Sequence, residues 1–106
     1  MTKTELRTKV LLSTMDGLIG YISDNVRMIT IDWSEKHYYI RAFFNRPTTE
    51  DDLDDFKAVS TEVGADFPSM IDFKEEVIFS LKPIAELPPL KEMVFLRKGE
   101  IEEEDY

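Results

Sequence analysis

Cysteine is absent from this chain, and histidine occurs only once, at His37. Without cysteine the chain can form no disulfide, has no thiolate nucleophile and cannot bind zinc through sulfur. A single histidine with carboxylates is a poor ligand set for a transition metal. We therefore expect no metal and no cofactor, and the lack of cysteine suits a reducing compartment.

Glycine-rich loops, long apolar runs and an apolar leader are also lacking. The four glycines are scattered, so they form no phosphate-binding loop. No apolar run approaches the roughly 20 residues that cross a membrane. The first ten residues carry charges within a helical pattern, whereas a secretory signal needs a continuous apolar stretch. The cytoplasm is the expected location.

Negative charge is what the chain has in excess. Its 106 residues include 22 acidic and 13 basic side chains, for a net charge of −9. Residues 1–48 hold seven basic and five acidic side chains (+2), against six and seventeen in residues 49–106 (−11). Nucleic acid and anionic membranes repel such a surface, and a basic protein is attracted to it. The composition therefore favours a cationic protein partner.

Apolar periodicity predicts two helices and four strands. A helical spacing of apolar residues runs from Thr4 to Ile22, and a second begins at Thr49 and ends before Pro68. Period-two alternation marks four strands, at residues 27–33, 38–45, 70–81 and 93–97. The apolar stripe expected to face inward on the first helix comprises Leu6, Val10, Leu11, Met15, Leu18, Ile19 and Ile22.

The element order is therefore α-β-β-α-β-β. Hairpins pair neighbouring strands antiparallel, and two helices with one apolar stripe each need a common surface to cover. We predict an α+β two-layer sandwich, with two helices on one face of a mainly antiparallel four-stranded sheet, in a single domain over residues 1–99. The phase of the strands leaves open which sheet face the helices cover. Residues 100–106 form an acidic tail that we expect to be disordered and dispensable for folding.

Acidic residues are densest at the start of the second predicted helix, in residues 50–55. At 100° per residue, Asp51, Asp54, Asp55 and Glu62 fall on the face opposite the apolar stripe. Acids in a first helical turn are stabilised by the helix dipole, which accounts for part of this block. The rest concentrates negative potential where a basic partner would be captured. The acids alternate with apolar residues and no glycine follows, so a calcium loop is not expected.

Aromatic residues near the predicted hairpin provide a second candidate contact surface. Trp33 precedes the turn, and Tyr38 and Tyr39 follow it. Such side chains serve as interface anchors when exposed, and are equally common as ordinary strand residues. A catalytic reading would have to use His37 or scattered carboxylates, and neither a nucleophile motif nor a cofactor motif accompanies them.

Four stretches of the chain resemble small acidic immunity proteins that accompany bacterial polymorphic toxins, including those of contact-dependent growth inhibition systems. The stretches are LRTKVLLSTMDGLIGYISDNVRMITIDW, FFNRPTTEDDLDDF, STEVGADFP and PIAELPPLKEMVFLRKGE, and the resemblance spans residues 5–99. The resemblance implies a protein that binds and neutralises a cognate toxin domain, commonly a basic nuclease. It transfers no contact residue to this chain.

Two other functions remain open from the residues alone. One is a small cytosolic hydrolase or ligand-binding enzyme that uses scattered carboxylates. The other is a housekeeping subunit that forms a homodimer through the open sheet face. Neither explains the strong acidity of the second half, which an interaction protein for a basic partner does.

Overall fold

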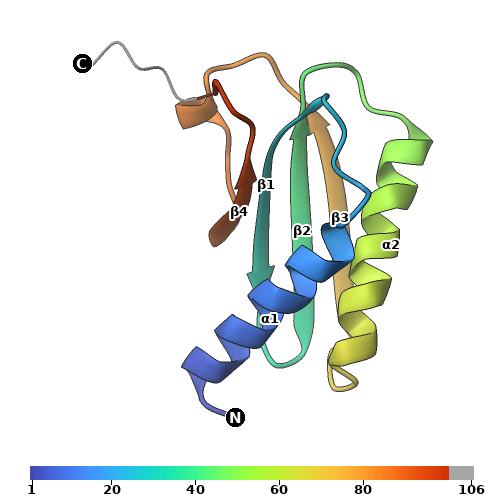
Figure 1. Ribbon diagram of the computed structural model, residues 1–106, viewed down its shortest axis with the longest axis vertical. Coiled ribbons are helices and arrows are strands. Elements are labelled where there is room, and N and C mark those ends of the chain that lie inside the picture. The colour runs from blue at the N-terminus through green and yellow to red at the C-terminus, as the bar shows by residue number, and fades with distance from the viewer. Residues whose placement is uncertain (101–106) are drawn as a thin grey trace.

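The computed structural model describes residues 1–100 of the chain. Two helices lie on one face of a four-stranded sheet (Figure 1). The elements in chain order are α1 (Lys3–Leu18), β1 (Val26–Trp33), β2 (His37–Phe44), α2 (Glu50–Asp66), β3 (Asp72–Phe79), the short 3-10 helix η1 (Ile84–Glu86) and β4 (Glu92–Leu96). The α+β class and the α-β-β-α-β-β order are confirmed, with η1 added before the last strand. Within residues 1–100, neither helix is long and apolar enough to cross a bilayer.

Capping boxes begin both long helices. The Thr2 hydroxyl accepts a hydrogen bond from the Glu5 amide, and the Glu5 carboxylate accepts one from the Thr2 amide, both at 3.1 Å. In α2, Thr49 and Asp52 exchange the same pair of bonds. Each box satisfies amide groups that a helix start leaves without a partner within the helix.

The sheet is mixed, and the prediction of a mainly antiparallel sheet is wrong in one of its three pairings. The strand order is β3-β2-β1-β4. β1 runs antiparallel to both β2 and β4, whereas β2 and β3 are parallel. Helix α2 connects β2 to β3, and a helical crossover returns the chain in the same direction, whereas a tight hairpin reverses it. The last two strands therefore do not pair with each other and occupy opposite edges of the sheet.

The main core lies between the sheet and the helices. The inward-facing strand residues are Ile29, Ile31 and Trp33 of β1 and Tyr38, Ile40, Ala42 and Phe44 of β2. They pack against Val10 and Leu18 of α1 and against Phe56, Val59 and Val63 of α2. This settles which sheet face the helices cover.

The connection between β3 and β4 covers part of the other sheet face. Because these strands lie at opposite edges, residues 80–91 must cross β2 and β1. The crossing is fixed by two hydrogen bonds: the Leu90 amide donates to the Thr30 hydroxyl at 3.0 Å, and Arg41 donates to the Pro88 carbonyl at 2.7 Å. Leu87 closes a second apolar cluster with Met28 and Phe43. The proline-rich segment is thus a cover, and the outer face is not fully open.

Helix α1 differs from its predicted form in length and in orientation. It ends at Leu18, and the chain turns at Gly20, whose φ of 87° suits glycine. Three residues assigned to its inward stripe, Met15, Ile19 and Ile22, are exposed. Gly17 lies instead against α2, where an added Cβ would meet the Glu62 Cβ at 3.4 Å. The buried side of α1 is therefore rotated, relative to the predicted stripe, toward its contact with α2.

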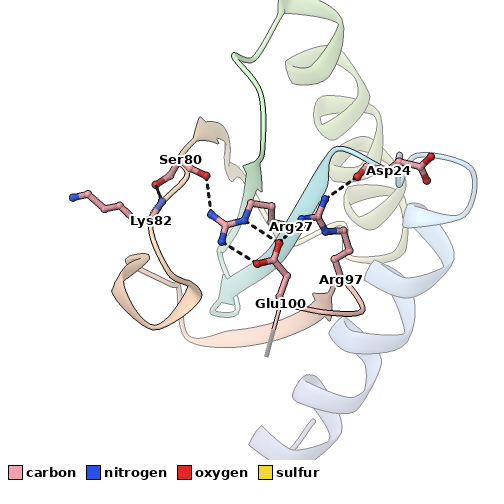
Figure 2. A network of polar contacts seen from close by, with 6 residues as sticks. All are labelled: Asp24, Arg27, Ser80, Lys82, Arg97 and Glu100. Carbon is pink, nitrogen blue, oxygen red and sulfur yellow. Dashed lines mark hydrogen bonds and ion pairs between the residues drawn. The ribbon is translucent and has the colours of Figure 1, made fainter. Parts of the chain in front are cut away.

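A buried ion pair fastens the end of the domain (Figure 2). Arg27 of β1 donates two hydrogen bonds to the Glu100 carboxylate, each 2.9 Å long, and a third to the Ser80 carbonyl. Arg97 also donates to Glu100, at 2.8 Å. The Arg27 and Glu100 side chains are 8% and 7% exposed. Glu100 therefore belongs to the folded part of the chain, although the sequence assigns it to the tail. The rest of that tail, residues 101–106, lies outside the described residues.

The Arg27–Glu100 pair predicts a loss of stability on neutralisation. Glu100→Gln should lower the free energy of unfolding by about 1–3 kcal/mol, because the buried Arg27 charge loses its counter-ion. The hydrogen bond from Arg27 to the Ser80 carbonyl would remain. Urea titration of the variant measures this, with the exposed Glu86→Gln as a control. Equal stability of the two variants would contradict the assignment.

The same pair predicts a pH dependence. The hydrogen bonds from Arg27 lower the pKa of Glu100 in the folded chain. A carboxyl with a lowered folded pKa contributes its stability above its unfolded pKa of about 4.3, and loses it as the pH falls through the folded value. Stability measured from pH 7 to pH 3 should therefore fall less steeply in Glu100→Gln than in the parent chain. Parallel curves would show that Glu100 does not contribute.

Candidate partner-binding surface

The acidic block at the start of α2 divides into one internal and several external carboxylates. Asp51, Asp54 and Glu62 are exposed and Asp55 is half-buried. Within residues 1–100 none of these four carboxylates forms an ion pair or a hydrogen bond. We call these four residues the acidic face. The structure brings them together on one side of α2, as the helical spacing predicts.

Asp52 has a different role, because its side chain is turned into the protein. Its carboxylate accepts hydrogen bonds from the Arg46 guanidinium at 2.6 and 2.9 Å, and from the Thr49 amide at 2.8 Å. The bonds from Arg46 are the main cause of its lowered pKa. Asp52 therefore holds the start of α2 against the segment that follows β2. Asp52 is therefore not part of the acidic face.

The acidic face lies beside α1, because the two helices run antiparallel and in contact. Gly17 of α1 is next to Val59 and Glu62 of α2, while the Ser13 hydroxyl donates to the Asp66 carboxylate at 2.6 Å. Higher numbers in α1 thus meet lower numbers in α2. The C-terminal end of α1 therefore lies beside Val59 and Glu62 of α2. Asp66 acts as a hydrogen-bond acceptor at the end of α2.

The three aromatic candidates do not form one surface. Tyr38 is completely buried, and its hydroxyl shares a 2.8 Å hydrogen bond with Thr14 of α1. Burial raises the pKa of Tyr38 far above its ordinary value. Trp33 is also in the core, with the Lys91 ammonium 4.0 Å from its ring centre. Both side chains are in the core on the helix side of the sheet, so neither is exposed as an anchor in this structure, and their part in partner binding stays a prediction.

Tyr39 alone of the three lies on the outer sheet face. Its ring packs on the His37 imidazole at 4.8 Å between centroids, and the Lys74 ammonium lies 5.9 Å from it. It is half-buried among these neighbours. Because the helices cover the opposite face of the sheet, Tyr39 and the acidic face cannot contact one flat partner surface together.

Exposed apolar residues on α1 were not anticipated from the sequence. Leu12, Met15 and Ile19 are 58%, 51% and 77% exposed. Their spacing of three and four residues places them on one side of the helix. The available signal was an apolar pattern too wide for one face: α1 and its C-cap carry large apolar residues on the buried side and on the exposed side. We call these three residues the apolar ridge.

The chain matches the family described as MafI2 immunity protein over residues 7–99. It belongs to that family. The resemblance to immunity proteins of polymorphic toxin systems is thereby confirmed, and an immunity protein has a toxin as its partner. No curated protein matches the chain.

One arrangement within residues 1–100 resembles a catalytic triad, and its hydrogen bonds are those of a turn cap. Ser34, His37 and Asp32 lie together at the β1–β2 hairpin, with a Ser34 Oγ to His37 Nδ1 distance of 2.7 Å. Ser34 Oγ also accepts hydrogen bonds from the amides of Lys36 and His37, both at 3.2 Å. An oxygen whose lone pairs serve two amides is a poor nucleophile. The Asp32 carboxylate is occupied by the Trp33 amide at 2.7 Å.

Metal ligands are not gathered anywhere in the described part of the chain. Residues 1–100 contain no cluster of three histidine or carboxylate side chains that could hold a metal ion. A cleft of about 600 Å³ lies between the start of α1 and the hairpin. It is lined by Trp33, Arg7 and Lys91 among others, and the acidic face lies outside it.

The division of the acidic block into internal and external carboxylates predicts unequal effects of neighbouring substitutions on stability. Asp52→Asn should lower the free energy of unfolding by about 1–2 kcal/mol, because it weakens the bonds from Arg46 and the capping box. The matched variant Asp54→Asn/Asp55→Asn should change it by less than about 0.5 kcal/mol. Thermal and urea unfolding of both variants provide the measurement. A double variant as unstable as Asp52→Asn would show that the acidic face is needed for folding.

Proposed function

We propose that this chain neutralises a basic toxin domain by binding it, with the acidic face of α2 guiding the encounter. Family membership supplies the class of partner. The observation that carries the proposal is the set of four outward carboxylates without counter-ions within residues 1–100. Asp52 shows that the fold can pair an acid where pairing is needed. The unpaired state of its neighbours is therefore consistent with a partner that supplies the positive charges.

The length of the acidic face suits an extended basic surface. Asp51 and Glu62 are eleven residues apart in α2, which corresponds to about 16 Å along the helix. This exceeds the Debye length of about 8 Å at physiological ionic strength. Charges spread over such a distance act on different parts of a partner. Steering by a charged surface can raise association rates from about 10⁵–10⁶ M⁻¹s⁻¹ toward 10⁸ M⁻¹s⁻¹ at low salt.

A toxin that acts on nucleic acid fits this surface best. An enzyme that binds nucleic acid needs a cationic patch for the phosphate backbone. An acidic immunity protein can occupy that patch, and it thereby competes with the substrate. The net charge of −9 adds long-range attraction for such a partner. The cytoplasm, where nucleic acid is exposed to such a toxin, is the corresponding place of action.

Binding kinetics should separate steering from folding. We expect Asp51→Asn/Asp54→Asn/Asp55→Asn to slow association with the toxin domain encoded beside this chain's gene by about tenfold or more at low salt. The difference should shrink at high salt, where screening removes the attraction. The dissociation rate should change much less.

The control variant removes the same charge elsewhere. Glu35→Gln/Asp72→Asn/Glu86→Gln also neutralises three exposed carboxylates, and these lie away from the outer surface of α2. Its association rate should fall much less than that of the α2 variant. Equal slowing by both variants would show that net charge alone matters. If the α2 variant associates as fast as the parent chain, the acidic face does not steer binding. The acids of residues 50–55 would then serve only to stabilise the N-terminal end of α2.

A further inference from the structure

A pocket of about 470 Å³ opens between α2 and β3, at one edge of the sheet. β3 is an edge strand in the order β3-β2-β1-β4, and Figure 1 shows α2 alongside it. Met70 and the Phe73 ring form the apolar part of the lining. Gly64 lets the ring lie against α2, because an added Cβ there would stand only 3.0 Å from it. The pocket thus has an apolar wall that the helix backbone supports.

Two polar side chains that line the pocket have no partner. The Glu75 carboxylate is half-buried and forms neither an ion pair nor a hydrogen bond within residues 1–100. Ser60 is 3% exposed, and no group in the described part of the chain bonds to its hydroxyl. A buried hydroxyl without a partner is uncommon and costly. Both groups accept hydrogen bonds, so together they suit a donor that carries positive charge.

The charges around the pocket also favour a cation. Lys57 lines the pocket too, but its side chain is exposed, whereas Glu75 is half-buried. Burial is the main cause of the raised pKa of Tyr38, and the nearby charge of Glu75 adds to it, so this carboxylate lies toward the core. The exposed Glu50 and Asp54 share the side of α2 that carries Lys57, at 100° per residue. Three carboxylates against one ammonium make this side of the domain negative.

The free edge of β3 offers backbone groups to an extended chain. The amides of Asp72 and Ser80 donate hydrogen bonds toward β2, and the register between them has no shift. Backbone groups of successive strand residues point to alternate sides, so those of Phe73, Glu75 and Val77 point away from β2. Within residues 1–100 no further strand pairs with this edge. A segment of another protein can pair there and would then lie beside the pocket.

We propose that the pocket receives a lysine or arginine side chain of the toxin, carried by an extended segment that pairs with the free edge of β3. The cationic group bonds to the Glu75 carboxylate and the Ser60 hydroxyl, and its aliphatic part packs on Phe73. This inference rests on the proposed function and names a contact that holds the complex together. The acidic face attracts the toxin, and the pocket retains it.

A second copy of the chain does not supply such a side chain. In an antiparallel two-fold pair of β3 strands, both copies keep their helices on the same side of the joined sheet. The basic residue of β3 is Lys74, which lies on the outer sheet face with its ammonium 5.9 Å from the Tyr39 ring. Lys74 therefore points away from the pocket of either copy. A basic segment of the toxin meets the requirement.

The test neutralises the carboxylate in the pocket with little change in its shape. Glu75→Gln should leave the circular dichroism spectrum and thermal unfolding close to those of the parent chain, because no described group is bonded to this carboxylate. The probe is the toxin domain encoded beside this chain's gene. Its dissociation should become about tenfold faster or more, because an enclosed charge loses its counter-ion. The effect should persist at high salt, because an enclosed pair is screened less than the exposed acidic face.

Two further variants separate binding from folding. Ser60→Ala removes a hydroxyl that has no partner in the described chain, so stability should not fall, whereas dissociation should become about threefold faster. Lys57→Gln should slow dissociation, because it removes a like charge beside the incoming cation. Faster dissociation of Lys57→Gln together with slower dissociation of Glu75→Gln would assign the pocket to an anion and overturn the proposal.

The control Asp72→Asn neutralises an exposed carboxylate of the same strand. Asp72 is level with His37 of β2 and so lies on the outer sheet face. Its dissociation rate should equal that of the parent chain. If Glu75→Gln also dissociates as slowly as the parent, the pocket proposal is overturned and the acidic face stays the proposed function. A parent chain that does not bind the toxin would instead overturn the proposed function itself.

Amide hydrogen exchange tests the pairing with β3 in the same preparations. In the free chain, the amides of Phe73, Glu75 and Val77 should exchange faster than those of Lys74 and Glu76, which face β2. Binding of the toxin should protect the first set. Unchanged exchange of that set in the complex would overturn the proposal. Protection of the same amides in a dimer of the parent chain, seen by sedimentation without toxin, would assign the edge to a second copy and also overturn it.

Discussion

The position of β1 and β2 at the centre of the sheet constrains everything else in this protein. Helix α2 follows β2 as a crossover and leads to β3, which pairs parallel to β2, and β4 pairs at the free edge of β1. The chain must then cross the outer sheet face to reach that edge, and it does so with the proline-rich segment that buries Leu87. The helices cover one face of the central strands, and this segment covers part of the other. In the described part of the chain, the outer side of the two helices is exposed, as at Leu12, Asp51 and Glu62.

Charge is divided between holding the fold and meeting the partner. Asp52 and Glu100 are internal, and each is bonded to an arginine: Asp52 to the partly exposed Arg46 and Glu100 to the buried Arg27. The acidic face has no such partner within residues 1–100. Carboxylates that stabilise the fold and carboxylates that meet a partner must point in different directions, the first into the protein and the second toward solvent. In α2 that separation is achieved within a single helical turn, between Asp52 and its neighbours.

Local sequence patterns predicted the helices and strands, but they did not predict which residues far apart in the sequence pair with each other. The two caps, the hairpin and the alternating strands could be read from spacing, because each depends on residues close in sequence. The parallel pairing of β2 and β3 could not, since the strand pattern is the same for either direction. Glu100 looked like the first residue of a tail because its partner, Arg27, is 73 residues away. The sequence left Tyr38 open between a surface aromatic and an ordinary strand residue for the same reason, because its bond to Thr14 depends on where α1 packs.

The candidate surface was half predictable. The acidic face follows from helical spacing alone, whereas the pocket between α2 and β3 required knowing that β3 lies at the edge of the sheet beside α2. The most direct test of the central claim is amide chemical-shift mapping of the isotope-labelled chain with the unlabelled toxin domain. We expect the largest changes in residues 51–62 of α2, with the hairpin at residues 34–37 and the segment 82–90 unchanged. Changes centred on that hairpin or on the outer sheet face would contradict binding through the helix layer.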